Sequence, residues 1–373
     1  MKLPKPNNIN AQKYVAGMSF FRKKLAKIKL SANESALGPS PKAKKEYIKV
    51  SKSFARYPDS DGNHLRESLG NKFKLDKNRI ILGAGSDQIF ELICKAYLKK
   101  GDEVIVPKYS FIIYRIYSKM SGAKVIYSKE NNFTVSVKEI LKKVSSKTKV
   151  VFLANPNNPT GTYITKKDLL FLRKKLRSNI LLVVDDAYFE YVKQKDYSSA
   201  LKLFLNFKNV VMTRTFSKIY GLAGLRVGWG YGSKEIIDVL NKIKPPFNVN
   251  KAALFAASAA VKDSAWLNKE IKHVNNWNVK MFYEFKKMKI ETNRSYSNFL
   301  LVLIFIFLNS LNIFLFQLLT CLISLFNQAL SFTAADAANK AALFTLKGGL
   351  ILFNVSIISF DPYPHPTLNP ARP

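Results

Sequence analysis

Strand-length apolar runs alternate with helix-length amphipathic segments through the first 300 residues of the chain. The runs typical of buried strands are 103–106, 150–153, 180–184 and 210–213. Between the second and third run lies 165–176, where Thr165 and Asp168 form a helix-start signal and leucines recur on one face. Strands separated by such helices form parallel sheets with helices on both faces. The pattern therefore predicts an α/β fold built on a mostly parallel sheet.

Polar residues directly follow three of these predicted strands. The segments are ANPNNPTG at 154–161, DDAY at 185–188 and RTFSK at 214–218. Open parallel sheets bind ligands outside the carboxyl ends of their strands. We therefore expect an amide from Asn158, a carboxylate from Asp185 and an amine from Lys218 to meet at one edge. Each residue alone also has an ordinary explanation, since Lys218 is one of 49 lysines and Asn158 can start a turn at Pro159.

A glycine-rich turn precedes another amphipathic segment upstream. Residues 82–87 read LGAGSD, and the helix-like segment 88–98 follows. Glycine lets the backbone approach a ligand closely, and a helix N-terminus binds anions through its free N–H groups and its dipole. Arg226, eight residues after Lys218, offers a bidentate positive charge for the same anion. These features predict a phosphate site, although the glycine turn alone also fits an ordinary helix start.

Three motifs together resemble the signatures of fold type I pyridoxal-phosphate aminotransferases. They are TFSKIYGLAGLRVG at 215–228, NNPTG at 157–161 and DDAY at 185–188. Two further motifs, ANESALGPSP at 32–41 and RYPD at 56–59, are similar to those of the histidinol-phosphate aminotransferases within that family. The resemblance covers about residues 29–301. It implies a fold type I transferase with a large cofactor-binding domain and a smaller α/β domain that looks incomplete here.

The resemblance also implies roles for individual residues. Lys218 would form the imine with the aldehyde of pyridoxal 5′-phosphate and then move a proton between substrate and cofactor. Asp185 would pair with the protonated pyridine nitrogen. Asn158 and Tyr188 would hydrogen-bond the phenolic oxygen of the ring. Lys218, Asp185 and Tyr188 are therefore the predicted catalytic residues.

Further residues match cofactor-binding positions of the family. The predicted phosphate site consists of Gly85, Ser86, Thr215, Ser217, Arg226 and Asp87, the last through its backbone. Tyr57 matches a tyrosine that reaches the phosphate of the neighbouring subunit, so the resemblance implies a homodimer. Tyr109 matches an aromatic residue that stacks on the ring, although core packing explains a tyrosine there equally well.

The resemblance to the subfamily predicts the reaction. We expect transamination between histidinol phosphate and 2-oxoglutarate or glutamate, in histidine biosynthesis and in the cytoplasm. A threonine-phosphate decarboxylase would use the same cofactor residues and is one alternative. A catalytically impaired polypeptide is another, because relatives carry a late arginine that clamps the substrate carboxylate. Arg372 is the only arginine after residue 298, and no family-like strand surrounds it.

The composition changes abruptly near residue 299. The first 298 residues contain 57 Lys and Arg against 23 Asp and Glu, whereas the remaining 75 contain three against two. No charged side chain occurs from 295 to 335. We interpret 301–373 as an anomalous tail produced by a shifted reading frame or a junction, with a membrane helix or an unusual buried domain as alternatives. The remaining predicted segments are an N-terminal arm with part of the small domain (1–50), a large cofactor-binding domain (51–250), and a connecting helix with the start of the small domain (251–300).

The net charge of +35 does not indicate a nucleic-acid site, because the lysines are spread along the chain rather than clustered. Cys94 and Cys321 are too few for a disulfide framework. The three histidines lie at no metal-ligand spacing, so no metal is predicted. We also expect no signal peptide, because residues 1–29 contain no long apolar core.

Overall fold

The computed structural model describes residues 12–14, 20–21, 24–25 and 32–303 of the 373-residue chain. A seven-stranded sheet in the order β3-β11-β10-β9-β8-β4-β5 forms its centre. The strands are β3 (Ile80–Gly83), β11 (Gly228–Tyr231), β10 (Val210–Thr215), β9 (Leu181–Asp185), β8 (Thr148–Ala154), β4 (Glu103–Pro107) and β5 (Lys124–Ser128). Six strands of this sheet run in the same direction, and β11 runs opposite to them. The predicted, mostly parallel sheet is confirmed, and the four predicted runs form β4, β8, β9 and β10.

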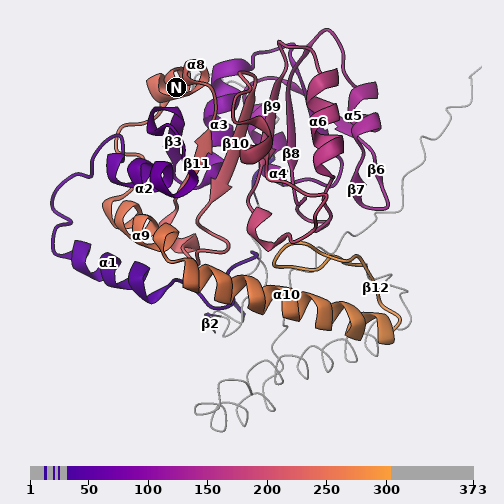
Figure 1. Cartoon of the computed structure of the whole chain (residues 1–373). Helices are drawn as coiled ribbons and strands as arrows, with labels where there is room; N and C mark the ends of the chain where they lie inside the picture. The colour runs from indigo at the N-terminus through magenta and orange to yellow at the C-terminus, as the bar shows by residue number, and fades with distance from the viewer. Residues whose placement is uncertain (1–11, 15–19, 22–23, 26–31, 304–373) are drawn as a thin grey trace, which may run out of the picture.

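Alternate residues of the central strands pack against different helices. In β8, Val151 and Leu153 belong to one buried cluster, whereas Val150 and Phe152 belong to another. Successive side chains of a strand point to opposite faces, so the two clusters lie on the two faces of the sheet. Apolar residues on both faces are typical of a parallel sheet that helices cover on both sides, and Figure 1 shows this layering.

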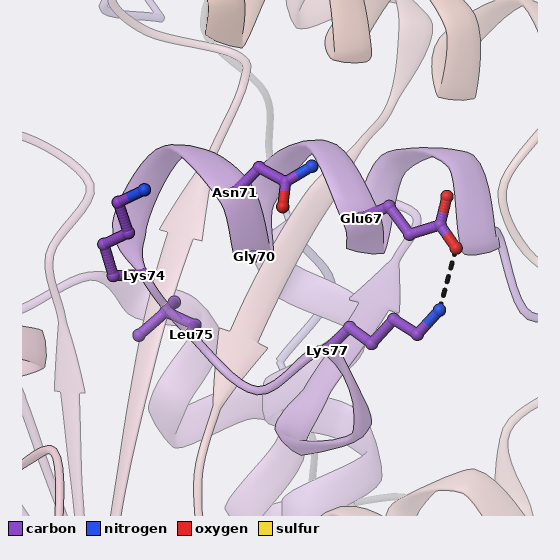
Figure 2. A pocket seen from close by; sticks show the side chains of 6 residues that line it. All are labelled: Glu67, Gly70, Asn71, Lys74, Leu75 and Lys77. Atoms are coloured by element: carbon purple, nitrogen blue, oxygen red, sulfur yellow. Dashed lines mark hydrogen bonds and ion pairs between the residues drawn. The ribbon is translucent and has the colours of Figure 1, made fainter.

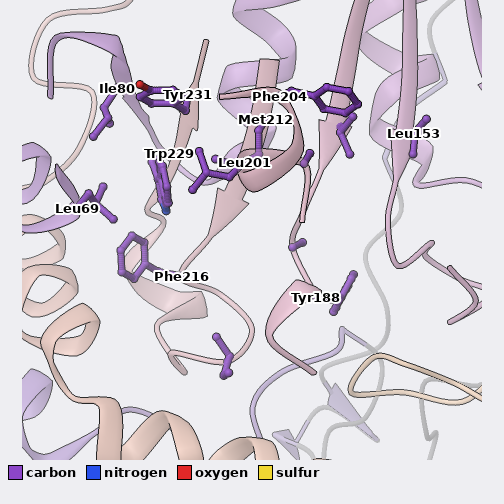
Figure 3. Close-up of a cluster of buried hydrophobic side chains, with 14 of the residues drawn as sticks. Leu69, Ile80, Leu153, Tyr188, Leu201, Phe204, Met212, Phe216, Trp229 and Tyr231 are labelled. Atoms are coloured by element: carbon purple, nitrogen blue, oxygen red, sulfur yellow. The ribbon is translucent and has the colours of Figure 1, made fainter. Parts of the chain in front are cut away.

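The helices divide between these two faces. One face carries α3 (Ser86–Tyr97), α4 (Ile112–Met120) and α8 (Lys234–Ile243). The other carries α2 (Asn63–Phe73), α5 (Val137–Lys142), α6 (Lys166–Lys175), α7 (Ala200–Phe204) and α9 (Lys251–Lys262). Figure 3 shows part of the core beneath this second set, including Phe216, Trp229 and Tyr188. The Asp168 N–H donates to Thr165 Oγ1 at 3.1 Å, which confirms the predicted start of α6.

The long helix α10 (Ser264–Lys287) crosses below the sheet in the view of Figure 1. It leads to an antiparallel pair, β12 (Glu291–Thr292) and β13 (Val302–Leu303). Phe285 of α10 packs with Ile290, Leu300 and Val302 in a small separate cluster. The remaining short elements are β1 (Phe20–Phe21), β2 (Lys24–Leu25), α1 (Pro41–Ser51), η1 (Lys77–Arg79), β6 (Glu130–Asn131), β7 (Thr134–Val135), η2 (Phe189–Tyr191) and η3 (Ala223–Leu225).

The predicted tail, 301–373, lies almost wholly outside the described residues, so its limits and those of the other predicted segments stay predictions. Within the described part of the chain, no helix has the length and apolar character needed to cross a membrane.

Candidate active site

The carboxyl ends of β8, β9 and β10 bring the predicted residues together. Asp185 is the last residue of β9 and lies in register with Thr213 of β10. Asn158 and Lys218 lie in the loops that follow β8 and β10, and both approach Tyr188. Asn158 Nδ2 donates to Tyr188 Oη at 3.5 Å, and Lys218 Nζ lies 5.9 Å from the centre of the Tyr188 ring. The amide, the carboxylate and the amine therefore share one edge of the sheet, as the sequence predicts.

The Asp185 carboxylate is buried and receives two hydroxyl hydrogen bonds. The residue is 5% exposed. Tyr114 Oη donates to Oδ2 at 2.8 Å, and Thr213 Oγ1 donates to Oδ1 at 3.2 Å. Burial raises the pKa of Asp185 to about 6, while the two hydrogen bonds act in the opposite direction. A carboxylate in this setting is stabilised by a cation that enters the site, such as a protonated ring nitrogen.

The Lys218 amine is also removed from water. Its Nζ donates to the carbonyl oxygen of Ala32 at 2.8 Å. Burial lowers the pKa of Lys218 to about 8, against the attraction of Asp87, Glu34 and Asp185. A lower pKa increases the fraction of neutral amine near neutral pH, and the neutral amine is the form that attacks a carbonyl carbon.

The loop that carries Lys218 requires glycine at position 221. Gly221 has a φ of +67°, and a Cβ atom there would collide with the backbone of Gly38 and Pro39. The Gly221 N–H also donates to the Lys218 carbonyl oxygen at 3.0 Å. The lysine loop and the 32–41 motif therefore pack against each other directly, which places Ala32 within reach of the amine.

Two side-chain amides donate to the Tyr188 hydroxyl. Asn33 Nδ2 donates to Tyr188 Oη at 2.9 Å, in addition to the bond from Asn158. A tyrosine oxygen accepts two hydrogen bonds, so its own O–H remains available for a third partner. Burial raises the pKa of Tyr188, and the Asn33 hydrogen bond acts against that rise. The hydroxyl is thus arranged as a donor toward an acceptor such as a phenolic oxygen.

Glycines shape a cradle at the N-terminus of α3. Gly85 is the N-cap residue with a φ of +81°, and a Cβ atom there would collide with the guanidinium of Arg226. A Cβ atom on Gly228 would collide with the backbone of Gly85 and Ser86. Because these side chains are absent, the first N–H groups of α3 lie beside Arg226. Free helical N–H groups next to a guanidinium form a site that fits a phosphate group.

Side chains of the predicted phosphate site surround this cradle. Arg226 Nη1 donates to Ser217 Oγ at 3.3 Å, and Arg226 Nη2 donates to Asp87 Oδ2 at 3.1 Å. The Ser217 N–H donates to Thr215 Oγ1 at 3.1 Å. Burial raises the pKa of Asp87, although its attraction to Arg226 opposes the rise. The donor set, with Ser86 at the start of α3, fits the phosphate of pyridoxal 5′-phosphate.

Tyr109 and Tyr57 have other partners in the structure. The Tyr109 ring lies beside that of Phe133, with centres 5.7 Å apart, and its backbone N–H donates to Glu130 Oε1 at 2.7 Å. Tyr57 is 80% exposed and stacks on Phe247, with ring centres 4.7 Å apart. The stacking of Tyr109 on a cofactor ring and the contribution of Tyr57 to a neighbouring subunit therefore stay predictions.

Residues 295–299 lie against the same site. The Tyr296 N–H donates to the Gly161 carbonyl oxygen at 2.8 Å, and Asn298 Nδ2 donates to the Asn33 carbonyl oxygen at 3.0 Å. The ring of Phe299 meets that of Tyr188 edge to face, with centres 5.2 Å apart. This segment therefore connects the end of the described chain to the residues around Lys218.

An open surface pocket at the end of α2 involves none of these residues. Figure 2 shows its lining, which consists of Glu67, Gly70, Asn71, Lys74, Leu75 and Lys77. Lys77 Nζ donates to Glu67 Oε1 at 2.8 Å, so these two charges neutralise each other. The lining of this pocket contains no buried charged side chain comparable to Asp185 or Lys218 at the strand ends.

Comparison with known proteins decides the family of the chain. The model of the family "Aminotransferase class I and II" matches residues 26–307. The chain belongs to this family. This aminotransferase is 55% identical over 302 residues to the histidinol-phosphate aminotransferase of Pelagibacter ubique (strain HTCC1062). The aligned residues cover 81% of this chain and 84% of that relative. It is 42% identical over 301 residues to the enzyme of that name from Rhodopseudomonas palustris (strain BisB18), covering 80% and 82%.

Solved structures show the same fold. The histidinol-phosphate aminotransferase of Sinorhizobium meliloti, in complex with pyridoxal-5′-phosphate, matches with a TM-score of 0.72 at 24% identity, covering 75% of this chain and 76% of that one. An aspartate aminotransferase of Thermus thermophilus matches with a TM-score of 0.68 at 20% identity, covering 74% and 82%. The fold type I architecture that the motifs predict is confirmed for this aminotransferase.

Three residues of the aminotransferase site were not among those predicted from its sequence, namely Tyr114, Thr213 and Asn33. Thr213 lies within an apolar strand, and Tyr114 lies on the buried face of a helix, so neither differs from an ordinary core residue in sequence. Asn33 lies inside the 32–41 motif, and that motif was the available signal.

Proposed function

We propose that this aminotransferase binds pyridoxal 5′-phosphate and exchanges an amino group between histidinol phosphate and 2-oxoglutarate. The observation that carries the proposal is the meeting of Lys218, Asp185 and the anion cradle at Arg226 on one edge of the sheet. The names of relatives that are 42% and 55% identical support the substrate, and support it over the phosphothreonine decarboxylation that shares the cofactor residues. The solved relative that carries the cofactor supports its identity.

Each residue has a distinct task in this proposal. The cofactor, when bound, withdraws electrons from the substrate α-carbon. Lys218 would bond to the cofactor aldehyde carbon and, once displaced by the substrate amine, take the proton from the substrate α-carbon and deliver it to that cofactor carbon. Asp185 would hold a proton on the pyridine nitrogen, while Tyr188 and Asn158 would donate to the phenolic oxygen. The cradle at Gly85 would hold the phosphate and so help to orient the ring. Tyr109 would orient the ring as well, by stacking on it.

A spectrum and a turnover assay test the proposal together. The protein purified with pyridoxal 5′-phosphate should absorb in the visible and convert histidinol phosphate with 2-oxoglutarate. Lys218→Ala should lose the visible band and all measurable turnover, because no other amine replaces the nucleophile. Lys195→Ala, which removes an exposed lysine, is the matched control and should change neither. An unchanged spectrum of Lys218→Ala would remove this residue from the site.

The same assay decides between an active enzyme and the catalytically impaired alternative. The late arginine that clamps a substrate carboxylate has no match after residue 298, and the family match ends at residue 307. A protein that binds the cofactor but does not convert histidinol phosphate would support the impaired alternative. Turnover would show that another residue holds the carboxylate of 2-oxoglutarate, since histidinol phosphate itself has no carboxylate.

A homodimer completes the proposed site, since Tyr57 would reach the phosphate of a second copy. Phe247, on which Tyr57 stacks, is 41% exposed, and Ile48 and Phe54 in the segment that precedes Tyr57 are 65% and 55% exposed. Lys251 Nζ donates to the Ser53 carbonyl oxygen, which ties this region to the start of α9. Exposed apolar patches of this kind mark association surfaces. The expected cytoplasmic location stays a prediction.

A further inference from the structure

The Asp185 carboxylate depends on a residue that the proposed mechanism does not otherwise use. Tyr114 lies on α4, 71 residues away in sequence, and its hydroxyl donates to Asp185 Oδ2 at 2.8 Å. Tyr114 has no exposed surface. The direction of this hydrogen bond is fixed, because the hydroxyl carries the proton and an ionised carboxylate can only accept.

Aromatic neighbours hold the Tyr114 ring in place. It stacks on Phe152 of β8 with centres 5.2 Å apart and planes 5° from parallel. Phe90 and Phe111 meet it edge to face at 5.0 and 5.7 Å. Rings packed in this way cannot change rotamer without disrupting the core. The hydroxyl is therefore a fixed donor that orients the carboxylate of Asp185.

The surroundings of Asp185 favour its protonated form, so the hydrogen bond from Tyr114 is needed to keep it ionised. Burial raises the pKa of Asp185, and the charge of Asp87 on α3 raises it slightly further. Asp185 in turn attracts the Lys218 ammonium and repels the neighbouring Asp186. On the other side, Thr213 supplies one longer hydrogen bond, at 3.2 Å, and the backbone of Ala187 supplies a hydrogen bond with a smaller effect on the carboxylate. Tyr114 is therefore the strongest protein donor to this carboxylate among the described contacts.

We propose that Tyr114 is a positioning residue that keeps Asp185 ionised and aimed at the ring nitrogen of the cofactor. The proposal rests on the proposed function, because the ring nitrogen belongs to pyridoxal 5′-phosphate. Removal of the hydroxyl leaves Oδ2 with one fewer donor and favours the protonated carboxyl. A neutral carboxyl attracts the pyridinium less, so both cofactor affinity and turnover should fall at neutral pH and recover at higher pH.

Tyr114→Phe tests this with two readouts. The dissociation constant of pyridoxal 5′-phosphate is measured on the apoprotein from pH 6 to pH 9, and kcat is measured over the same range. Because the pKa of Asp185 is about 6, a rise of about one unit on loss of this hydrogen bond predicts roughly a twofold loss of kcat near pH 7 and a larger loss at pH 6. The acid limb of both profiles should move up by about one pH unit, because the carboxyl pKa rises. Tyr127→Phe, which removes an exposed hydroxyl, is the control and should leave both profiles unchanged.

The outcomes separate the two proposals. If the wild-type protein does not bind pyridoxal 5′-phosphate, the proposed function fails. If it binds the cofactor but Tyr114→Phe keeps the wild-type pH profiles, at whatever level of activity, the role of Tyr114 is overturned. Should Tyr114→Phe not fold, Thr213→Val removes the weaker donor to the same carboxylate. An upward shift of its acid limb would support the role of these hydroxyls, and no shift would overturn it.

Discussion

The two ends of the candidate site, at Asp185 and at Arg226, differ in how deeply their charged side chains are buried. At the ring end, Asp185 is 5% exposed and relies on hydroxyl donors within the core. At the phosphate end, the paired side chains of Arg226 and Asp87 are 47% and 34% exposed. Buried charges interact strongly and are weakly screened, whereas water and salt weaken exposed ones. The comparison teaches that the ring end should mainly control turnover, with a smaller effect on cofactor affinity, and that the phosphate end should mainly control affinity.

The largest expected effect lies at the ring end. Asp185→Asn should lower kcat by roughly a thousandfold, because a neutral amide cannot hold the proton on the ring nitrogen. The cradle should still retain the cofactor, with a dissociation constant within about tenfold of the wild type. Steady-state kinetics and a cofactor titration measure the two quantities. Asp238→Asn, which breaks an exposed ion pair on α8, is the control.

The opposite result would break the comparison. If Asp185→Asn turns over like the wild type, then Asp185 is not the partner of the ring nitrogen. If it loses the cofactor altogether, the ring end also controls affinity.

A smaller effect is expected at the phosphate end. Arg226→Ala should weaken cofactor binding by roughly tenfold to hundredfold, because it removes a charge-assisted hydrogen bond to the phosphate. The dissociation constant of Arg226→Lys should lie between those of the wild type and Arg226→Ala, since lysine keeps the charge but not the bidentate geometry. Binding measured at low and high salt should show a steeper salt dependence in the wild type than in Arg226→Ala. Equal dissociation constants in all three proteins would exclude this residue from the cradle.

The smallest effect belongs to the predicted contact between subunits. Tyr57→Phe keeps the ring that stacks on Phe247 and removes only the hydroxyl, so it should weaken cofactor binding by about threefold to tenfold. The variant should remain a dimer in sedimentation velocity experiments. The role of Tyr57 would be contradicted if Tyr57→Phe bound the cofactor as tightly as the wild type, or if the wild-type protein were a monomer.

Sequence reasoning could predict the residues that the chain places next to strand ends. Asn158, Asp185 and Lys218 follow three strands whose apolar runs are easily recognised, and parallel strands end at one edge. Gly85 and Arg226 belong to motifs whose residue types suit an anion. The positions of these five residues therefore followed from local patterns and one topological rule.

Contacts between distant core residues could not be predicted in this way. The bond from Tyr114 to Asp185 depends on how α4 packs against β8, and nothing in a short window encodes that packing. Asn33 and Tyr188 are 155 residues apart, and their contact depends on the fit of Gly221 against the N-terminal motif. Tertiary packing, rather than local propensity, determines these partners.

The contacts that Tyr296, Asn298 and Phe299 make with the residues around Lys218 set a minimum length for any working version of this protein. A chain cut before Tyr296 would leave the carbonyl oxygens of Gly161 and Asn33 without their donors, and would uncover one edge of the Tyr188 ring. Any foreign sequence joined to this body must therefore begin after Phe299, and it would follow directly on a ring that lies against Tyr188.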